Sequence, residues 1–358
     1  MSWQSRIAPL AEAALHNRAV PGLVLAVARG HDVPEYLVLG TDAAGRALTT
    51  DSLFPVASIT KLATALAVLR LVADGMLELD DPLAKHLPDA AAAQDGVTLR
   101  TMLSHTAGLP IDLAPEAAPY APGLDWPALV RACLATPPAA APLIEVQYSN
   151  VGSGLLAIVV ERRTGLPIRE ALETHVLSPL GIEGTLGSEP PRPPAVLTGE
   201  LGDHAGTALE PFNSPFWRSL GMPWGGLLTT AAGALALVRA YAGVPAGFLP
   251  ADILADATRD QTGGLGGGLF GSLRWPRCPW GLGAELRGDK APHWTPAEAS
   301  PDSFGHVGAS GCLAWCDPAA DVAWAILGTR TFERWWRAWP SIGAAVLATG
   351  GPAGSVSA

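Results

Sequence analysis

Strand-like segments occur at both ends of this chain, and helix-like segments fill the long stretch between them. Near the N-terminus, GLVLAVARG (22–30) and EYLVLG (35–40) are apolar runs separated by the turn-forming HDVP. Beyond residue 270 the strand pattern returns in WGLGAEL, SFGHVGA, GCLAWCD and DVAWAILGTR, before a final helix that holds FERWWRAW and IGAAVLA. We therefore predict an α+β fold, in which an antiparallel sheet is flanked by helices and a mostly helical domain is inserted.

The predicted boundaries divide the 358 residues between two domains. Residues 1–57 and 268–358 form an α/β domain built from both termini, and residues 58–267 form the mostly helical domain, with a site at their boundary. Apolar residues make up 49% of the chain and charged residues only 16%, which permits large buried cores and excludes general disorder. The glycines of 266–271 match G-x-G-x-x-G by letter, but no strand precedes them, so we expect a flexible turn.

The formal net charge of −10 argues against nucleic acid or an anionic membrane surface as a partner. The first 20 residues read as an amphipathic helix rather than a signal peptide, and no apolar run approaches the length of a membrane span, so we expect a cytoplasmic protein. Four scattered cysteines lack a C-x-x-C pair and a close histidine, which predicts reduced core thiols without a metal or other cofactor: Cys133, Cys278, Cys312 and Cys316. The last two should share one face of a strand.

One apolar helix opens with polar residues that would be costly to bury. In PVASITKLATALAVLRL (55–71), most residues after Ile59 are Ala, Leu or Val, which is typical of a helix enclosed by protein. In one interpretation Ser58 caps the helix and Lys61 reaches out to solvent. In the other, Lys61 shares a helix face with Ser58 and helps to remove its proton, so that Ser58 acts as a nucleophile.

A second polar cluster, VQYSNVGSG, lies between a Pro-rich stretch and a helix. Tyr148, Ser149 and Asn150 are ordinary turn residues in the structural interpretation. In the functional interpretation Tyr148 is a general base or proton shuttle, and Asn150 donates a hydrogen bond to a substrate carbonyl.

A third cluster, FGHVGASG, places His306 on a predicted strand. A single histidine in a strand is commonly structural, but here it could also supply a proton or partial positive charge to a reacting group. Gly308 would allow a substrate to approach the backbone closely. The N–H groups of Ala309 and Ser58 would together form an oxyanion hole.

The motifs S-x-x-K (58–61), Y-S-N (148–150) and H-V-G (306–308) occur in this order, and the ordered trio is more specific than any one of them. With these motifs the chain resembles the serine β-lactamase and penicillin-binding-protein family, in particular the branch related to class C β-lactamases. VPGLVLAV, LSHTAGL, WGGLLTTA and GHVGASGCLAWCDP resemble the same branch.

The resemblance implies a β-lactamase/transpeptidase-like fold with Ser58 as the nucleophile. Lys61 and Tyr148 would share the general-base work, Asn150 would hold the substrate, and His306 would fill the third-motif position. Class C β-lactamases usually carry a lysine there, a permanent cation that would hold the carboxylate of a β-lactam. Because histidine is mostly neutral at pH 7, we expect an esterase or a D-amino-acid peptidase rather than an efficient β-lactamase.

The expected function is a serine hydrolase that forms an acyl-enzyme from a small ester or amide. The alternatives are an acyltransferase, in which an amine or alcohol replaces water in deacylation, and an inactive binding or sensor protein of the same fold. Five tryptophans either surround the cleft and favour an apolar acyl group or simply pack in the core: Trp217, Trp224, Trp275, Trp280 and Trp294.

Overall fold

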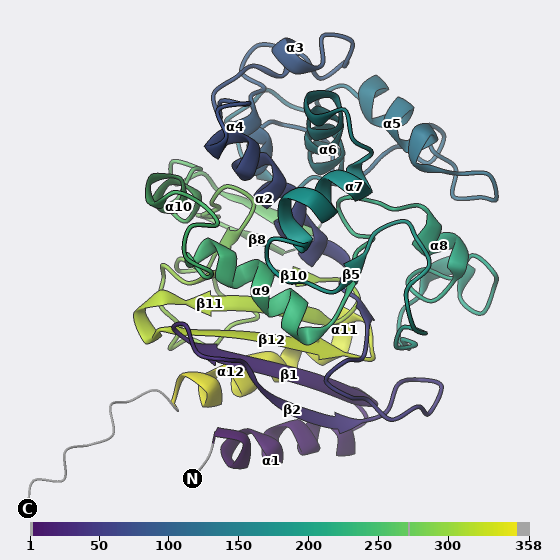
Figure 1. The fold of residues 1–358 in the computed structure, drawn as a ribbon, viewed down its shortest axis with the longest axis vertical. Helices are drawn as coiled ribbons and strands as arrows, with labels where there is room; N and C mark the ends of the chain where they lie inside the picture. The colour runs from purple at the N-terminus through teal and green to yellow at the C-terminus, as the bar shows by residue number, and fades with distance from the viewer. Residues whose placement is uncertain (1–2, 271–272, 349–358) are drawn as a thin grey trace, which may run out of the picture.

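The computed structural model describes residues 3–270 and 273–348. At its centre is a six-stranded antiparallel sheet with strand order β2-β1-β12-β11-β10-β9 (Figure 1). Two strands come from the N-terminal end and four from the C-terminal end: β1 (Gly22–Arg29), β2 (Glu35–Gly40), β9 (Glu285–Leu286), β10 (Phe304–Gly308), β11 (Cys312–Asp317) and β12 (Val322–Gly328). The predicted α+β fold is confirmed, although most of WGLGAEL is loop and only its last two residues join the sheet.

Both faces of the sheet are buried, which explains why β1 is a continuous apolar run without polar alternation. Val24 and Ala26 point into the core that the sheet shares with the helical part of the molecule. Leu23 and Leu25 point to the opposite face, into a second core rich in tryptophan. Because successive strand residues point to opposite faces, one apolar strand serves both cores.

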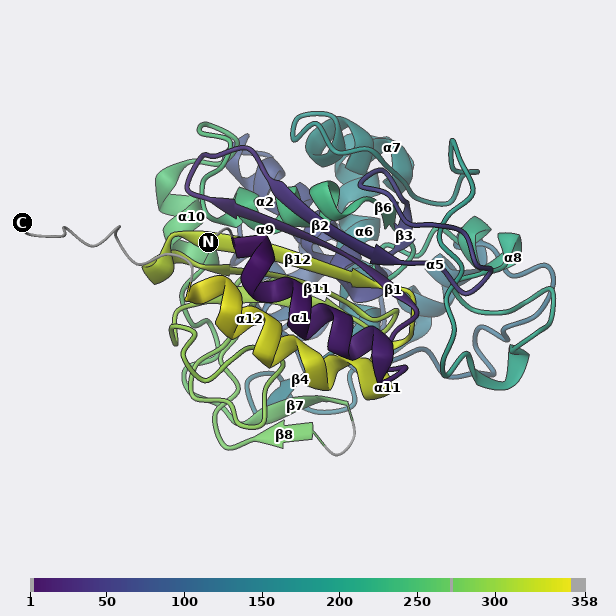
Figure 2. The same ribbon diagram turned by 90° about the horizontal axis from the view of Figure 1, so that it is seen from below.

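Helices from the two ends of the chain cover the outer face of the sheet. α1 (Trp3–His16) and α12 (Trp339–Leu347) run side by side across it, with α11 (Phe332–Trp335) at one end, as Figure 2 shows. The inner face packs against α9 (Ala231–Tyr241). Although α9 falls within residues 58–267, it lies on β12, β11 and β1, so in this respect the predicted domain division does not follow the packing.

The middle of the chain forms a cluster of helices beside the sheet (Figure 1). Its central element is α2 (Thr60–Ala73), which is buried along nearly its whole length and packs against α6 (Asn150–Thr164). The helix ends at Ala73, and Gly75 follows with a φ of +68°, a conformation common just after helix ends. The remaining helices are short: α3 (Leu83–His86), α4 (Leu99–Leu103), α5 (Trp126–Ala135), α7 (Ile168–Leu172), α8 (Pro215–Ser219) and α10 (Ala251–Ala257).

Two small sheets connect these parts. The first contains β3 (Phe54–Pro55), β6 (Leu228–Thr229) and β5 (Gly184–Thr185), and the second contains β4 (Val146–Gln147), β7 (Gly267–Phe270) and β8 (Leu273–Trp275). The glycine-rich segment is therefore partly a strand, and the prediction of a flexible turn is wrong there. A Cβ on Gly267 would lie 2.0 Å from the Val146 carbonyl oxygen, so glycine is what allows β7 to approach β4.

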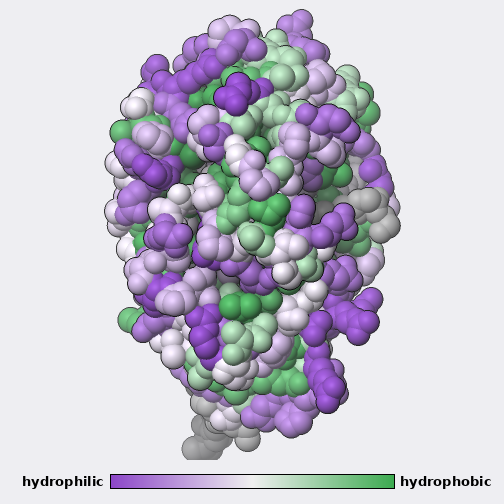
Figure 3. All heavy atoms as spheres, turned by 90° about the vertical axis from the view of Figure 1, so that its right-hand side faces the viewer, coloured by the Kyte–Doolittle hydropathy of each residue, from purple (hydrophilic) through white to green (hydrophobic). Residues whose placement is uncertain are grey.

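The mainly polar surface and the buried cysteines are consistent with the large buried cores that the composition permits. On the side that carries α8, polar residues cover most of the surface and apolar residues form patches between them (Figure 3). All four cysteines are buried and free, and Cys312 and Cys316 enter the same core, as predicted for one strand face. In the part of the chain that the structure describes, no helix combines the length and apolar character that a membrane span requires.

Candidate active site

Ser58 lies in a short 3-10 turn, Ala57–Ile59, directly before α2. The N-cap of α2 is Ile59, and no side chain caps the helix, so the interpretation of Ser58 as a helix cap is wrong. Ala57 has a φ of +45°, and the Thr60 hydroxyl donates a hydrogen bond to its carbonyl at 2.6 Å. Backbone strain of this kind is characteristic of functional sites and here sets the position of the half-buried Ser58.

Lys61 is only 3% exposed, so the interpretation that it reaches out to solvent is also wrong. Its Nζ donates to Ser58 Oγ at 3.3 Å, to Asn150 Oδ1 at 2.6 Å and to the Trp224 carbonyl at 2.9 Å. The nitrogen also lies 4.6 Å from the centroid of the Tyr148 ring. The structure thus brings together Ser58, Lys61, Tyr148 and Asn150, the four residues predicted from the first two motifs.

The environment of Lys61 suits a base. Burial lowers its pKa to about 7, against the opposing effect of the Asp112 carboxylate, which raises the pKa. A lysine with a pKa near neutrality is partly unprotonated at pH 7, so its nitrogen can accept a proton from a neighbouring hydroxyl.

The Tyr148 side chain is buried, and the Ser58 side chain acts on the pKa of its hydroxyl, lowering it against the larger effect of burial. Burial raises the pKa of this hydroxyl well above its ordinary value. The backbone at Tyr148 is held from two sides, because its N–H donates to the Gly268 carbonyl on β7 and the preceding N–H, of Gln147, donates to the His105 carbonyl. The glycine-rich strand therefore helps to position Tyr148.

Ser149 has a structural role in this turn. Its hydroxyl accepts a hydrogen bond from Gly152 N at 2.9 Å and so caps α6, and it donates to the Pro110 carbonyl at 2.6 Å. The Ser149 N–H donates to Nδ1 of His105 at 3.2 Å. His105 also packs its ring 4.7 Å from that of Tyr148. His105 therefore supports the Tyr-Ser-Asn turn.

The side-chain oxygen and nitrogen of Asn150 both have hydrogen-bond partners within the protein. Oδ1 accepts from Lys61, and Nδ2 donates to Oδ1 of Asp112 at 2.5 Å. Asp112 is exposed and acts electrostatically on both Lys61 and Tyr148. Asp112 could not be recognised from the sequence, because an isolated aspartate in a Pro- and Ala-rich loop carries no motif. The predicted substrate contact of Asn150 would share Nδ2 with this carboxylate.

His306 lies on β10 and is 1% exposed, with its ring 5.9 Å from that of Tyr148. Nδ1 is 2.7 Å from the Val307 carbonyl and must carry the proton, because a carbonyl only accepts. Burial, together with the nearby Lys61 charge, lowers the pKa of His306 to about 4. The imidazole is therefore uncharged at neutral pH, and its ring packs beside Tyr148.

Gly308 meets the Ser58 turn directly. A Cβ at this position would lie 2.2 Å from the Val56 carbonyl oxygen, so the close neighbour of Gly308 is the protein's own backbone rather than an approaching substrate. This contact places the end of β10, and hence Ala309, next to the turn that holds Ser58. The pairing of the Ala309 and Ser58 N–H groups in an oxyanion hole stays a prediction.

The five tryptophans are all buried, which supports core packing over an exposed cleft wall. Two of them nevertheless adjoin the site. The Trp224 carbonyl accepts from Lys61, and the Trp280 ring lies 5.9 Å from that of Tyr148. Within residues 3–270 and 273–348, no three histidine, cysteine or carboxylate side chains come together to hold a metal ion.

Comparison with known proteins agrees with the order and geometry of these motifs. The profile of the Beta-lactamase family matches residues 7–346. The chain belongs to this family. Over 342 residues it is 31% identical to the esterase EstB of Burkholderia gladioli, and the match covers 86% of each chain.

Solved structures show the same fold at lower sequence identity. EstCE1, described as a hydrolase with promiscuous acyltransferase activity, superposes with a TM-score of 0.80 at 21% identity, covering 96% of this chain and 98% of its own. The D-amino acid amidase of Ochrobactrum anthropi superposes with a TM-score of 0.74 at 19% identity, and the match covers 97% of this chain and 98% of the amidase. These two structures show the shared fold, and the similarity to an esterase together with the family match supports an enzyme of the beta-lactamase family.

Proposed function

We propose that this protein is a serine hydrolase that forms an acyl-enzyme at Ser58 from a small ester or amide. The observation that carries the proposal is the 3.3 Å contact between Lys61 Nζ and Ser58 Oγ, made by a buried lysine with a pKa of about 7. A serine hydroxyl becomes an effective nucleophile when a base lies within hydrogen-bond reach. The similarity to the esterase EstB supports an ester as the first substrate class to test.

In the proposed acylation step, Ser58 Oγ attacks the substrate carbonyl carbon and its proton passes to Lys61 Nζ. Tyr148 gives its proton to the departing alcohol or amine, and Lys61 then returns a proton to Tyr148. The N–H groups of Ser58 and Ala309 stabilise the negative charge on the carbonyl oxygen. Water attacks the acyl-enzyme by the reverse route, which releases the acid and restores the serine.

The charges beside Ser58 favour neutral or amine-bearing substrates. His306 is uncharged at neutral pH, so it cannot hold a carboxylate as a lysine would. Asp112 is exposed next to Asn150 and would repel a carboxylate but attract an ammonium group. We therefore expect neutral esters and D-amino-acid amides with a free amine to be better substrates than a cephalosporin.

A fluorophosphonate label tests the nucleophile directly. The unmodified protein should be labelled at Ser58, and Ser58→Ala should abolish the label and the hydrolysis of p-nitrophenyl esters. Lys61→Ala should lower turnover by about 10²–10⁴-fold, the range typical of a lost general base. Near-normal turnover in Lys61→Ala would remove this lysine from the mechanism.

The same assays separate the two alternatives. Products analysed with an added alcohol or amine acceptor distinguish transfer of the acyl group from hydrolysis. A protein that is neither labelled nor active on p-nitrophenyl esters, D-amino-acid amides or a chromogenic cephalosporin would instead be the inactive binding or sensor protein.

A further inference from the structure

A buried ion pair lies behind the site and has no role in the proposed reaction. Lys290 and Glu285 are both essentially inaccessible to solvent, and Lys290 Nζ lies 2.7 Å from Glu285 Oε1. The same nitrogen donates to the carbonyls of Leu286 at 2.8 Å and Pro279 at 3.0 Å, so all three of its protons have acceptors. His293 lies 3.4 Å from the same carboxylate oxygen. This arrangement fixes the lysine nitrogen in space.

The fixed cation lies against the ring of Trp280. Lys290 Nζ is 5.3 Å from the centroid of this fully buried indole. A desolvated cation within about 6 Å of an indole face attracts it, and tryptophan interacts most strongly of the aromatic side chains. The ion pair therefore restrains Trp280 from one side.

The other sides of Trp280 face the candidate site. Its ring centroid lies 4.8 Å from that of His105, 5.8 Å from that of His306 and 5.9 Å from that of Tyr148. These rings come from separate segments of the chain, and Trp280 contacts each of them. A shift of the Trp280 indole would therefore change its packing against Tyr148 and against His105 and His306, which also lie beside Tyr148.

We propose that Trp280, held in place by the Glu285–Lys290 ion pair, is a positioning residue that keeps the Tyr148 hydroxyl aligned with Ser58. This inference rests on the proposed function, because it assigns Trp280 to the alignment of the same proton transfer. Trp280 should affect turnover rather than substrate binding, because its side chain is enclosed by protein and does not line an open surface. A misplacement of about 1 Å in such a group can cost roughly 100-fold in rate.

The test compares Trp280→Leu with Trp339→Leu. Trp339 is a matched control because it is 1% exposed, lies in the same tryptophan-rich core and is on α12. In the described part of the chain neither indole N–H has a hydrogen-bond partner, so neither substitution removes such a bond. Both variants should lose stability, which is measured by thermal unfolding, and kinetics are then compared at a temperature where each is folded.

Trp280→Leu should lower kcat for a p-nitrophenyl ester and the rate of fluorophosphonate labelling by about 10- to 100-fold, with KM changed less than about threefold. Trp280→Phe, which keeps an aromatic ring, should recover most of that loss, and Trp339→Leu should retain the parent kcat. Equal kcat values in Trp280→Leu and Trp339→Leu would overturn the proposal. If the unmodified protein is not labelled at all, the proposed function fails instead, and the two failures are therefore distinguishable.

A second variant keeps the inference testable if Trp280→Leu does not fold. The double substitution Glu285→Gln and Lys290→Gln removes the cation from the indole without leaving a single uncompensated buried charge. It should lower kcat by about threefold or more at an unchanged KM, because the indole is no longer restrained. An unchanged kcat in this folded double variant would contradict the role of the ion pair.

Discussion

At the scale of single residues, the protonation of Lys61 should control the pH dependence of the enzyme. A base must be unprotonated to act, so kcat/KM for a neutral ester should rise with pH through a midpoint near 7, where burial places the pKa of Lys61. The Asp112 carboxylate raises this pKa, and Asp112→Asn should therefore move the midpoint to lower pH. Measurements of kcat/KM from pH 5 to 9 for the parent and for Asp112→Asn give the two midpoints. A midpoint that Asp112→Asn leaves in place would exclude Lys61 as the titrating base.

The neutral His306 leads to a second prediction at this scale. Because burial lowers its pKa to about 4, this ring does not become charged between pH 8 and pH 6. Any change in charge at the site over that range comes from Lys61, so His306→Gln should leave the pH dependence of KM unchanged for both an acidic and a neutral ester of matched size. An improvement for the acidic ester at pH 6 that His306→Gln abolishes would mean that His306 acquires a proton in the complex.

At the scale of elements, the approach of β10 to the Ser58 turn depends on Gly308. An alanine Cβ there would meet the Val56 carbonyl oxygen at 2.2 Å, and backbone on both sides leaves little room to adjust. We expect Gly308→Ala to lower the free energy of unfolding by about 1–3 kcal/mol, as overpacking typically does, and to reduce kcat. Gly225→Ala is the control for stability, because no atom lies within 4 Å of its added Cβ. Urea denaturation compares the two variants, and equal stabilities would contradict the predicted clash.

The sequence predicted elements well where the element's own residues form an apolar run. It predicted them less well where contacts between distant segments decide the structure. β1, β2, β10, β11 and β12 follow from short apolar runs, and α2 from an uninterrupted one. The Gly267 strand was missed because its pairing with β4 depends on a neighbour about 120 residues away. For the same reason Asp112 was missed, and Trp280 was left open between a place around the cleft and one in the core, since only the fold brings them to Tyr148.

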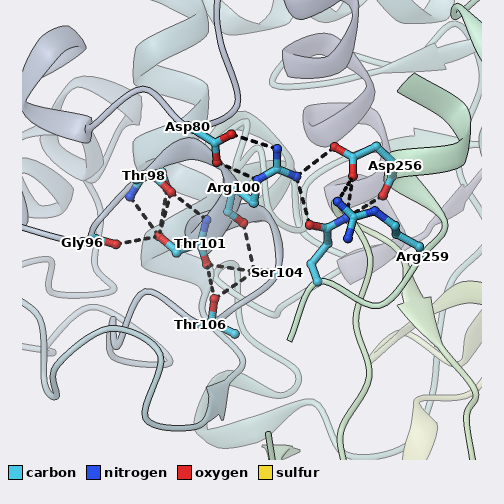
Figure 4. Close-up of polar contacts among 10 residues, drawn as sticks. Asp80, Gly96, Thr98, Arg100, Thr101, Ser104, Thr106, Asp256 and Arg259 are labelled. Carbon is cyan, nitrogen blue, oxygen red and sulfur yellow. Dashed lines mark hydrogen bonds and ion pairs between the residues drawn. The ribbon is translucent and has the colours of Figure 1, made fainter. Parts of the chain in front are cut away.

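At the scale of the whole molecule, Arg100 joins the helical part to the segment that leads back toward the sheet. It forms ion pairs with Asp80 at 2.7 Å and Asp256 at 2.8 Å and donates to Gln261 at 2.9 Å (Figure 4). Asp80 is 76% exposed at its side chain, so that pair contributes little, whereas Asp256 is only 22% exposed. We expect Arg100→Met to lower the free energy of unfolding by about 1–3 kcal/mol at pH 7.

The loss caused by Arg100→Met should depend on pH. Hydrogen bonds from Arg100 lower the pKa of Asp80. At Asp256 burial raises the pKa, but the hydrogen bonds from Arg100 and Gln261 and the charges of Arg100 and Arg259 together lower it by more. A carboxyl group whose pKa is lower in the folded state adds stability above its unfolded pKa of about 3.9, and this stability is lost as pH falls through the folded value. The difference in the free energy of unfolding between the parent and Arg100→Met should therefore be largest near pH 7 and shrink below pH 4.

Urea denaturation at pH 7, 5 and 3 measures this difference. Arg259→Met is the control, because Arg259 is 62% exposed and pairs with the same Asp256. A difference that stays constant down to pH 3 would show that Arg100 stabilises the molecule through packing of its side chain rather than through its charge.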